Sequence, residues 1–233
     1  MNASLLTRIF DLIAPRQCVI CGQRLAVTES VLCANCHRHL PLTLFEQHPH
    51  DNNMAQYLRG RFPVCRAAAL FHYEAKSSAA QLIYELKYHH RPDIGEHLGR
   101  ITAHQFAAAG FFQGIDAIVP VPLAPRRQWR RGYNQSKEIA RGISDFTGIP
   151  VYDNIVRRTN FHQSQTHLSQ WQRQANIDSS FHLLHPERIH GRHLLLVDDI
   201  VTTGTTVATL AQTLQQAGGV RFSVIALGFT KSK

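Results

Sequence analysis

The chain has 233 residues, of which 44% are apolar and 18% charged, and this composition excludes an intrinsically disordered protein. Its length suffices for one ordinary α/β domain with a small appended segment. The net charge of +9 favours polyanionic partners such as phosphates, pyrophosphate or nucleic acid, although a solvated basic surface produces the same balance.

The first apolar stretch, residues 5–13, is too short to span a membrane and is interrupted by Arg8 and Asp11. Its apolar residues form the stripe of an amphipathic helix, and no secretory signal is evident. We therefore expect a helix that packs on its own domain, no membrane span and a cytoplasmic location. Docking of this helix to a partner or a membrane surface is the alternative.

Four cysteines follow in the spacing C-x2-C-x11-C-x2-C, namely Cys18, Cys21, Cys33 and Cys36. Two such pairs can place four thiolates tetrahedrally around Zn²⁺, and Gly22 suits the tight turn that the first pair needs. The segment is too small to fold on apolar burial alone, so a structural zinc ribbon is predicted, with disulfides as the weaker interpretation. Cys65 stands alone and is expected to be a small buried residue.

Residues 41–63 are interpreted as a solvated connector with scattered histidines. This divides the chain into residues 1–62, which hold the N-terminal helix, the ribbon and the connector, and the main domain, residues 63–233.

The main domain alternates strand and helix patterns. A strand is expected at 67–73, helices at 77–88 and 93–109, and a buried strand at 115–121. Pro120 and Pro122 cannot donate to a sheet, so this second strand should stop there. Strands alternating with helices predict a parallel sheet flanked by helices.

A basic stretch follows the second strand and carries Arg126, Arg127, Arg130 and Arg131 before a helix that begins near Asn134. Guanidinium groups bind phosphate oxygens bidentately, so the stretch suits a pyrophosphate. A basic surface loop is one alternative. A nucleic-acid patch in which Trp129 and Tyr133 stack on bases is another.

Residues 157–181 are polar and rich in glutamine. A long polar insertion in a compact α/β domain is often a lid, and Gln163, Gln165 and Arg173 are the candidates for contacts made on closure. A surface helix between two connectors is the plain alternative.

The sequence LLLVDDIVTTGTTV, residues 194–207, gives a short buried strand, then Asp198 and Asp199, then a loop that opens onto a helix over 207–216. Backbone N–H groups at a helix N-terminus can hold a phosphate, and carboxylates accept hydrogen bonds from vicinal hydroxyls. The loop has neither the lysine of a Walker loop nor a dinucleotide fingerprint. We therefore expect a sugar phosphate here, and a final strand at 221–229.

VDDIVTTGTT resembles the phosphoribosyl-pyrophosphate (PRPP) motif of the type I phosphoribosyltransferases. The four cysteines, LKY, VPVPLAPRRQWRRGYNQSKEIA and RRTNFHQSQTHLSQWQRQANIDSSF, with VDDIVTTGTT, resemble the ComF/GntX family over almost the whole chain. The resemblance implies a type I phosphoribosyltransferase-like parallel sheet of about five strands, flanked by helices and carrying a small hood.

The resemblance also implies residue roles. Asp198 and Asp199 would be the catalytic carboxylates that hold the ribose hydroxyls. The 5-phosphate would lie on the loop formed by Thr202, Thr203, Gly204, Thr205 and Thr206. Pyrophosphate would be held by Val121, Pro122, Leu123, Arg126 and Arg127, with Mg²⁺ bridging pyrophosphate and ribose oxygens.

For function, the resemblance implies a PRPP-binding protein involved in the use of extracellular DNA as a nutrient, related to competence and DNA uptake. It could transfer phosphoribosyl to an acceptor that the sequence does not reveal. The alternative is a non-catalytic accessory protein that responds to PRPP or a nucleotide, or that binds nucleic acid. The sequence leaves the oligomeric state open.

Overall fold

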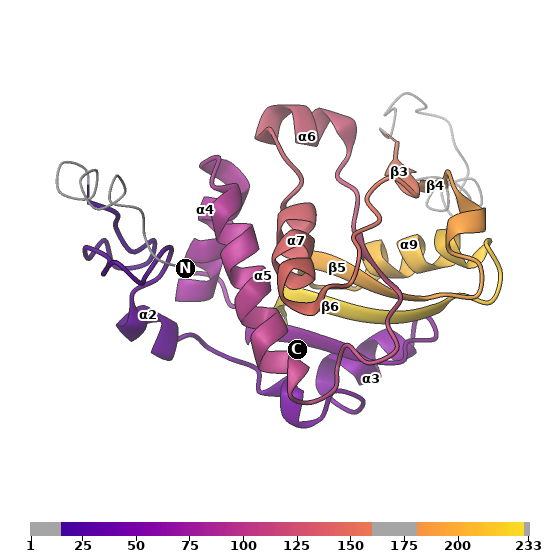
Figure 1. Cartoon of the computed structure of the whole chain (residues 1–233), viewed down its shortest axis with the longest axis horizontal. Helices are drawn as coiled ribbons and strands as arrows, with labels where there is room; N and C mark the ends of the chain where they lie inside the picture. Colours follow the sequence, from indigo (N-terminus) through magenta and orange to yellow (C-terminus); the bar gives the residue numbers. More distant parts are fainter. Residues whose placement is uncertain (1–14, 160–180, 231–233) are drawn as a thin grey trace.

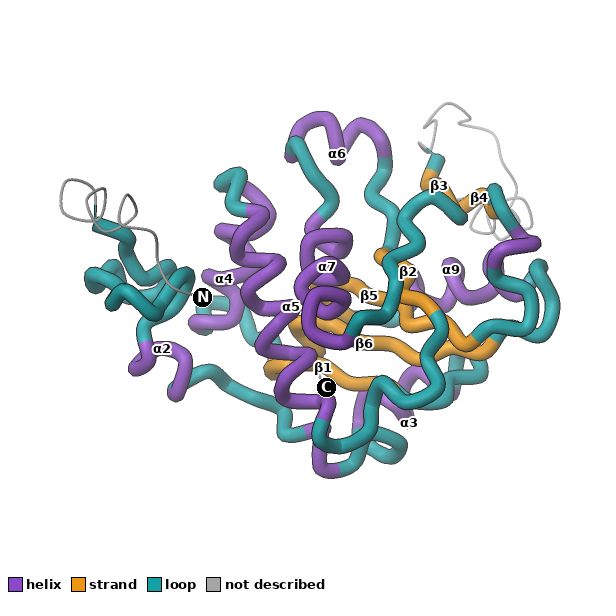
Figure 2. The backbone as a smooth tube through the Cα atoms, in the orientation of Figure 1, coloured by secondary structure: helices purple, strands orange, loops and turns teal. Residues whose placement is uncertain are grey.

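The computed structural model describes residues 15–159 and 181–230, whose chain forms an α/β domain around a parallel sheet (Figures 1 and 2). The sheet contains β1 (Ala67–His72), β2 (Ala117–Pro120), β5 (His193–Val201) and β6 (Arg221–Phe229) in the order β1-β6-β5-β2. These strands are buried almost throughout, as apolar runs covered on both faces should be.

The resemblance implied about five strands, and the described residues hold four in this sheet. One further parallel bridge joins Ile118 to Val151 beyond β2, where the Ile118 N–H donates to the Pro150 carbonyl. A separate antiparallel pair, β3 (Val156–Arg158) and β4 (Phe181–Leu183), borders the undescribed residues 160–180. Gln163, Gln165 and Arg173, the lid candidates, lie outside the described residues, as does the helix expected at 5–13.

Helices cover both faces of the sheet (Figure 1). Right-handed crossovers put α4 (Ser78–Tyr88) and α5 (Pro92–Ala107), which lead from β1 to β2, on one face together with α7 (Gln135–Thr147). The crossover from β5 to β6 runs in the opposite direction, so α9 (Thr205–Gln215) lies on the other face. The predicted parallel sheet flanked by helices is confirmed.

Three glycines bring α5 and α7 into backbone contact. A Cβ atom added at Gly99 would lie 2.3 Å from the Ile139 carbonyl oxygen, and one added at Gly142 would lie 2.1 Å from the Glu96 carbonyl oxygen. A Cβ atom added at Gly95 would lie 2.8 Å from the Cβ of Glu138. Because no side chain fits between the helices, α5 fixes the position of α7 and of the residues at its start.

The expected element boundaries hold to within a few residues, with one informative exception. The strand expected to end at Val197 continues to Val201, because Asp198 pairs with Ala226 and Ile200 with Gly228 of β6. The two acids are therefore part of a paired strand and their backbone is fixed by the sheet.

Residues 41–63 are not a solvated connector, which corrects that interpretation. They form a 3-10 turn, η1 (Phe45–Gln47), and the helix α3 (Asn53–Arg59), whose Met54 and Leu58 are fully buried. The amide of Asn52 caps α3 by accepting from the Met54 and Ala55 N–H groups, and it donates to the Ala67 carbonyl of β1 at 2.8 Å. The polar stretch at residues 50–53, directly before the first buried residue of the helix, hid it. The division of the chain at residue 62 stays a prediction.

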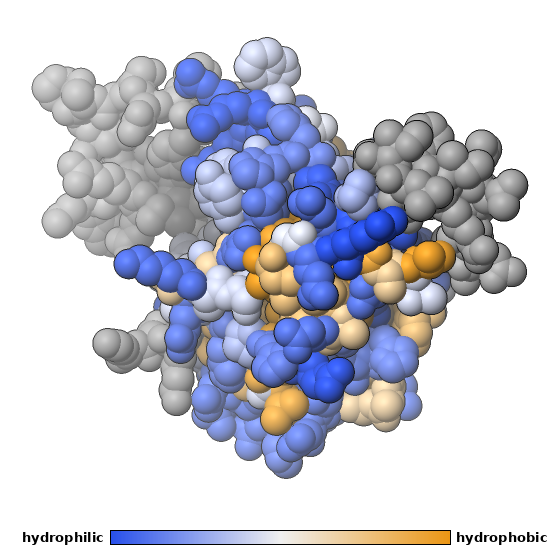
Figure 3. All heavy atoms as spheres, turned by 90° about the vertical axis from the view of Figure 1, so that its left-hand side faces the viewer, coloured by the Kyte–Doolittle hydropathy of each residue, from blue (hydrophilic) through white to orange (hydrophobic). Residues whose placement is uncertain are grey.

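The cysteine segment packs beside α4. Gln81 of α4 donates through Nε2 to the carbonyls of Val19 and Ile20, at 2.9 and 3.3 Å. Figure 3 views the molecule from the side of this segment and shows apolar residues gathered in the middle of the face, with hydrophilic residues around them. Within the described ranges, no helix is long and apolar enough to cross a membrane.

Candidate functional site

The carboxyl ends of β2 and β5 meet at one edge of the sheet, because Pro120 pairs with Val197 in the parallel register. Directly beyond this pair lies a cavity of about 340 Å³. Nine of the residues singled out from the sequence line it, namely Val121, Pro122, Leu123, Arg127, Arg131, Asp198, Asp199, Thr202 and Thr206. Ligands of open parallel sheets bind at this edge, so the cavity is the candidate functional site.

The two carboxylates differ in their surroundings. Asp199 is 5% exposed, and its Oδ2 lies 3.0 Å from Lys87 Nζ and accepts from Gln135 Nε2 at 2.7 Å. Asp198 accepts through Oδ1 from the hydroxyl of Ser136 at 3.2 Å and from the Asp199 N–H at 2.9 Å. Asp199 thus has a cation beside it, and Asp198 has only neutral donors.

Burial, reinforced by the neighbouring charge of Asp199, raises the pKa of Asp198 to about 7. The hydrogen bonds from Asp199 N–H and Ser136 and the charge of Lys87 oppose this rise without cancelling it. Asp198 can therefore take up or release a proton near neutral pH.

Three arginines also line the cavity: Arg127, Arg131 and Arg158. Nη1 of Arg131 is buried without a hydrogen-bond partner within the described residues, and so is Oε1 of Gln135. Burial, and next the charge of Arg127, lowers the pKa of Arg158. Guanidinium groups and carboxylates in one cavity provide partners for phosphate oxygens and for hydroxyls.

The basic stretch is a helix and not a loop. It forms α6 (Pro125–Arg131), in which Pro125 occupies the first turn and Gly132 ends the helix at φ 81°. The helix separates the four arginines: Arg127 and Arg131 line the cavity, whereas Arg126 does not. Arg130 lines a neighbouring basic cavity of about 380 Å³ together with Arg127, Arg131 and His90.

The threonine loop leads from β5 into α9. Thr202 and Thr206 line the cavity, whereas Thr203 and Thr205 do not, and the hydroxyls of these last two lie 3.1 Å apart. Gly204 is the N-cap of α9, and no side chain caps the first turn. The free N–H groups of that turn are therefore available to an anion.

Gly204 cannot be exchanged for a larger residue without strain. Its φ is +67°, and an added Cβ would lie 2.7 Å from Cδ2 of Leu58 in α3. Tyr57 of the same helix donates to the Thr203 carbonyl at 3.3 Å. The segment 41–63, through α3, thus supports the loop from behind.

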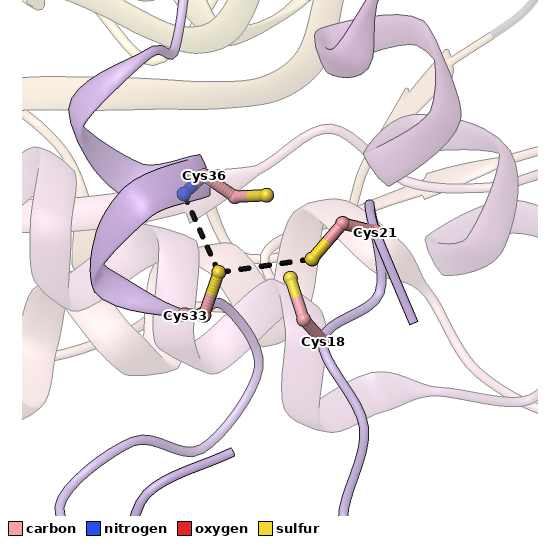
Figure 4. A group of neighbouring side chains, drawn as sticks. All are labelled: Cys18, Cys21, Cys33 and Cys36. Atoms are coloured by element: carbon pink, nitrogen blue, oxygen red, sulfur yellow. Dashed lines mark hydrogen bonds between the residues drawn. The ribbon is translucent and has the colours of Figure 1, made fainter. Parts of the chain in front are cut away.

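The four cysteines converge as the spacing predicted. Their sulfurs all lie within 4.8 Å of one another, and Figure 4 shows the thiols gathered between the 18–21 turn and the start of α2 (Ala34–Arg38). The Cys21 and Cys33 sulfurs are 3.8 Å apart. A tetrahedral site with Zn–S bonds of about 2.3 Å requires about this separation.

The four thiols differ in how readily they ionise before a metal ion binds. Burial opposes ionisation of Cys18, but backbone N–H groups of Cys21, Cys33 and Ile20 outweigh it and lower its pKa to about 7. Gly22 adopts φ +71° in the first turn, as expected. The pKa of Cys21 is raised, and so is that of Cys36, chiefly by burial, so the convergence of the four sulfurs, and not their acidity, is what indicates a metal site. Cys65 lies outside the cluster and is half-buried, so the expectation of full burial was wrong.

Sequence reasoning missed Lys87, Gln135, Ser136 and Arg158 as members of the site. Lys87 and Gln135 stood in the family-like stretches LKY and RGYNQ, but nothing in the spacing assigned them a partner. Ser136 enters the cavity because α7 begins at the edge of β2, and Arg158 because β3 turns back over the same edge. These positions depend on the tertiary packing of the elements and not on the local sequence.

No family model matches the chain. It is 34% identical to the DNA utilization protein YhgH of Escherichia coli over 215 residues, which cover 89% of this chain and 87% of the relative. It is also 28% identical to competence protein F of Haemophilus influenzae over 214 residues, covering 87% of this chain and 92% of the relative. Among solved structures it is similar to the glutamine PRPP amidotransferase of Bacillus subtilis, at 21% identity and a TM-score of 0.42, over 60% of this chain and 30% of that chain.

Proposed function

The chain belongs to the ComF/GntX family of its DNA utilization and competence relatives, and from this premise we propose that it binds PRPP and Mg²⁺ in the use of extracellular DNA. The observation that carries the proposal is the convergence of Asp198 and Asp199, Arg127 and the threonine loop on one cavity. A sugar that carries both a pyrophosphate and a phosphate needs carboxylates for its hydroxyls, a cation for the pyrophosphate and a loop of N–H and hydroxyl donors for the phosphate.

Each part of the cavity suits one part of PRPP. The carboxylates of Asp198 and Asp199 accept hydrogen bonds from the vicinal ribose hydroxyls. Arg127, Arg131 and Arg158 neutralise the pyrophosphate, and Arg131 Nη1 gains the partner it lacks. The 5-phosphate takes the hydroxyls of Thr202 and Thr206 and the first turn of α9.

Carboxylate oxygens next to phosphate oxygens are the donor set that Mg²⁺ prefers, and Asp198 and Asp199 supply them. Bound Mg²⁺ would neutralise part of the charge on the pyrophosphate leaving group. Asp198, with its pKa of about 7, can hold a proton near neutral pH. The proposed reaction is displacement of pyrophosphate at the anomeric carbon by an acceptor, in a cytoplasmic protein with structural Zn²⁺ at the four cysteines.

A second candidate function is contact with single-stranded nucleic acid through α6. Trp129 is 87% exposed at the centre of this helix, between exposed arginines, and it packs on no part of the described core. Aromatic faces between cations are the pattern on which bases stack. The phosphate backbone would lie on Arg126 and Arg130.

Calorimetric titration of the zinc-replete protein with PRPP and Mg²⁺ tests the first function. We expect saturable binding by the wild type and none by the double variant Asp198→Asn/Asp199→Asn. The matched control is Asp51→Asn/Glu187→Gln, which removes two exposed carboxylates elsewhere and should bind like the wild type. Unchanged PRPP binding by the first double variant would refute the site.

A further inference from the structure

The helix α3 meets the threonine loop at two consecutive residues. The hydroxyl of Tyr57 donates to the Thr203 carbonyl at 3.3 Å, across 146 positions of the sequence. Directly beside it, Cδ2 of Leu58 lies 2.7 Å from the place that a Cβ atom on Gly204 would occupy. A helix that is distant in the sequence therefore lies against the N-cap of α9.

The hydrogen bond from Tyr57 fixes more than the carbonyl that accepts it. The carbonyl of Thr203 and the N–H of Gly204 belong to one planar trans peptide, so they point in opposite directions. Because the carbonyl points to Tyr57, the Gly204 N–H points away from α3. This N–H stands at the start of α9, where the free donors of the first turn suit an anion.

Tyr57 is held in place by two neighbours. Its ring lies 6.2 Å from that of Phe229 at the end of β6, with the planes tilted by 57°. The guanidinium of Arg61 lies over the ring at 4.9 Å, and its Nη2 donates to the Tyr57 hydroxyl at 2.9 Å. Because the hydroxyl oxygen accepts from Arg61, its own proton is directed to the Thr203 carbonyl. Two hydrogen bonds in one direction strengthen each other.

Arg61 is in turn fixed by the chain on either side of it. Leu58 before it is fully buried, and Phe62 after it is 8% exposed. The N–H of Arg61 donates to the Leu58 carbonyl at 2.8 Å, and the ring of Phe62 packs edge-on against Phe222 of β6 at 6.2 Å. The backbone at Arg61 therefore cannot shift without disturbing the core.

The charge of Arg61 has no acidic partner in the part of the chain that the structure describes. Arg59, two residues earlier, lies 3.8 Å from Oδ1 of Asp51, whereas the contacts of Arg61 are with Tyr57. Its Cδ and Nε lie 3.3 and 3.5 Å from the Cβ position of Gly204. A cation at the positive end of a helix is unfavourable by itself, and a bound anion reverses this.

Little within the threonine loop fixes its conformation. No side chain caps α9, and Gly204 lies in the left-handed region at φ +67°. The hydroxyls of Thr203 and Thr205 lie 3.1 Å from each other, and the hydroxyl of Thr209 donates to the Thr205 carbonyl within the helix. The contacts from α3 therefore hold the loop from outside.

We propose that Tyr57 and Arg61 are positioning residues for the phosphate end of the candidate site. Tyr57 keeps the peptide between Thr203 and Gly204 in the orientation that presents its N–H to the 5-phosphate. Arg61 orients the Tyr57 hydroxyl and adds a positive charge at the N-cap of α9. The inference rests on the proposed function and adds two residues of the N-terminal segment to that site.

The experiment is calorimetric titration of the zinc-replete full chain with three probes. Ribose 5-phosphate reports on the phosphate end, pyrophosphate on the other end, and PRPP with Mg²⁺ on both. Tyr57→Phe removes the hydroxyl and keeps the ring against Phe229. Arg61→Met removes the charge, and Arg61→Lys keeps it.

The matched control is Arg188→Met. Arg188 also lies with its guanidinium over a tyrosine ring, at 4.5 Å from that of Tyr152, and it does not line the candidate site. The control thus removes the same kind of contact at a place that does not touch the threonine loop.

We expect Tyr57→Phe and Arg61→Met to bind ribose 5-phosphate and PRPP roughly fivefold more weakly than the wild type, which is the effect of one hydrogen bond. The affinity for pyrophosphate should stay unchanged in both variants. Arg61→Lys should recover most of the loss, because it keeps a cation at the N-cap. Arg188→Met should bind all three probes like the wild type.

A merely structural role of the two residues gives a different result. It predicts equal weakening at both ends of the site, or a lower free energy of unfolding with unchanged affinities. Either outcome overturns the inference, and so does a Tyr57→Phe variant that binds ribose 5-phosphate and PRPP like the wild type.

The wild type separates this inference from the proposed function. If it binds PRPP and the Tyr57→Phe variant binds it equally well, the positioning role alone is wrong. If the wild type binds pyrophosphate but neither ribose 5-phosphate nor PRPP, there is no phosphate end to position. If it binds none of the three probes, the proposed function fails and the inference fails with it.

Discussion

Lys87 Nζ lies 3.0 Å from Oδ2 of Asp199, with side chains that are only 20% and 8% exposed. The pair joins α4 to β5, two elements that are distant in sequence and adjacent at the edge of the sheet. It gives Asp199 a direct buried ion pair, whereas Asp198 forms no ion pair with the residues that the structure describes and feels the charge of Lys87 only from further away. The two carboxylates of the same strand therefore have different properties.

Lys87→Met should destabilise the protein because it leaves the buried carboxylate of Asp199 without a cation. We expect a loss of about 3 kcal/mol in the free energy of unfolding, measured by urea denaturation at pH 7. Gln135 still donates to the carboxylate, which keeps the loss at the lower end of the range for broken buried pairs.

Two control variants test whether the loss of stability in Lys87→Met comes from the buried charge. Arg100→Met removes an exposed pair with Asp145 and should cost less than about 1 kcal/mol. The double variant Lys87→Met/Asp199→Asn should recover most of the stability, since no buried charge remains. Equal losses in Lys87→Met and Arg100→Met would mean that the buried pair has no special weight.

Asp198 should make the fold less stable as the pH rises. Its pKa of about 7 in the folded protein lies above the 3.8 of a free aspartate, so the folded state binds the proton more tightly. The stabilisation is complete below about pH 4 and is lost as the pH passes through 7. Asp198→Asn should therefore have a melting temperature roughly 5 °C above that of the wild type at pH 8. At pH 4 the two proteins should melt at the same temperature.

Differential scanning calorimetry between pH 4 and 8 measures this difference. Asp51→Asn, which changes an exposed aspartate, should leave the pH profile of the wild type unchanged. A constant offset between Asp198→Asn and the wild type at all pH values would contradict the assignment of the raised pKa.

Arg127→Ala should weaken pyrophosphate binding by roughly tenfold, because a charge-assisted hydrogen bond contributes about 1.5–3 kcal/mol. Arg126 precedes it on the same helix and does not line the cavity, so Arg126→Ala is the natural control and should have little effect. Titration with pyrophosphate and with ribose 5-phosphate separates the two ends of the site. Equal losses in both variants would place the anion on the outer face of α6.

Cys33→Ser should remove the metal ion expected at the cysteine cluster. Cys65→Ser is the control, because Cys65 lies outside the cluster. Metal analysis of the purified proteins should give one zinc per chain in the wild type and Cys65→Ser, and none in Cys33→Ser.

Patterns that are local in sequence predicted their structures well. Strand 221–229, the first cysteine turn at Gly22 and the acidic pair before a helix all depend on neighbouring residues. The helix α3 was missed because its buried face has only a few apolar residues among polar ones. The helix α6 was missed because its four arginines were interpreted as a basic loop between the second strand and the next helix.

Only part of the candidate site could be predicted from the sequence, because some of its residues are distant from the motif along the chain. Asp198 and Thr202 belong to a contiguous motif that can be recognised in the sequence. Lys87, Gln135 and Arg158 reach the cavity from three other elements. Their roles depend on strand order and on the packing of α7, neither of which any short segment encodes. The antiparallel pair β3–β4 that positions Arg158 flanks the 21 undescribed residues 160–180 and had no pattern of its own.

The contact of α5 with α7 through Gly95, Gly99 and Gly142 has a consequence for how this protein can vary. Most helix contacts adapt to substitution because neighbouring side chains change rotamer, but at Gly99 and Gly142 the neighbours are carbonyl groups that cannot move without breaking helical hydrogen bonds. The distance between the two helices is therefore not adjustable by repacking. None of these three positions lines the candidate site or the basic cavity beside α6, yet they should tolerate exchange as poorly as the carboxylates that α7 helps to surround.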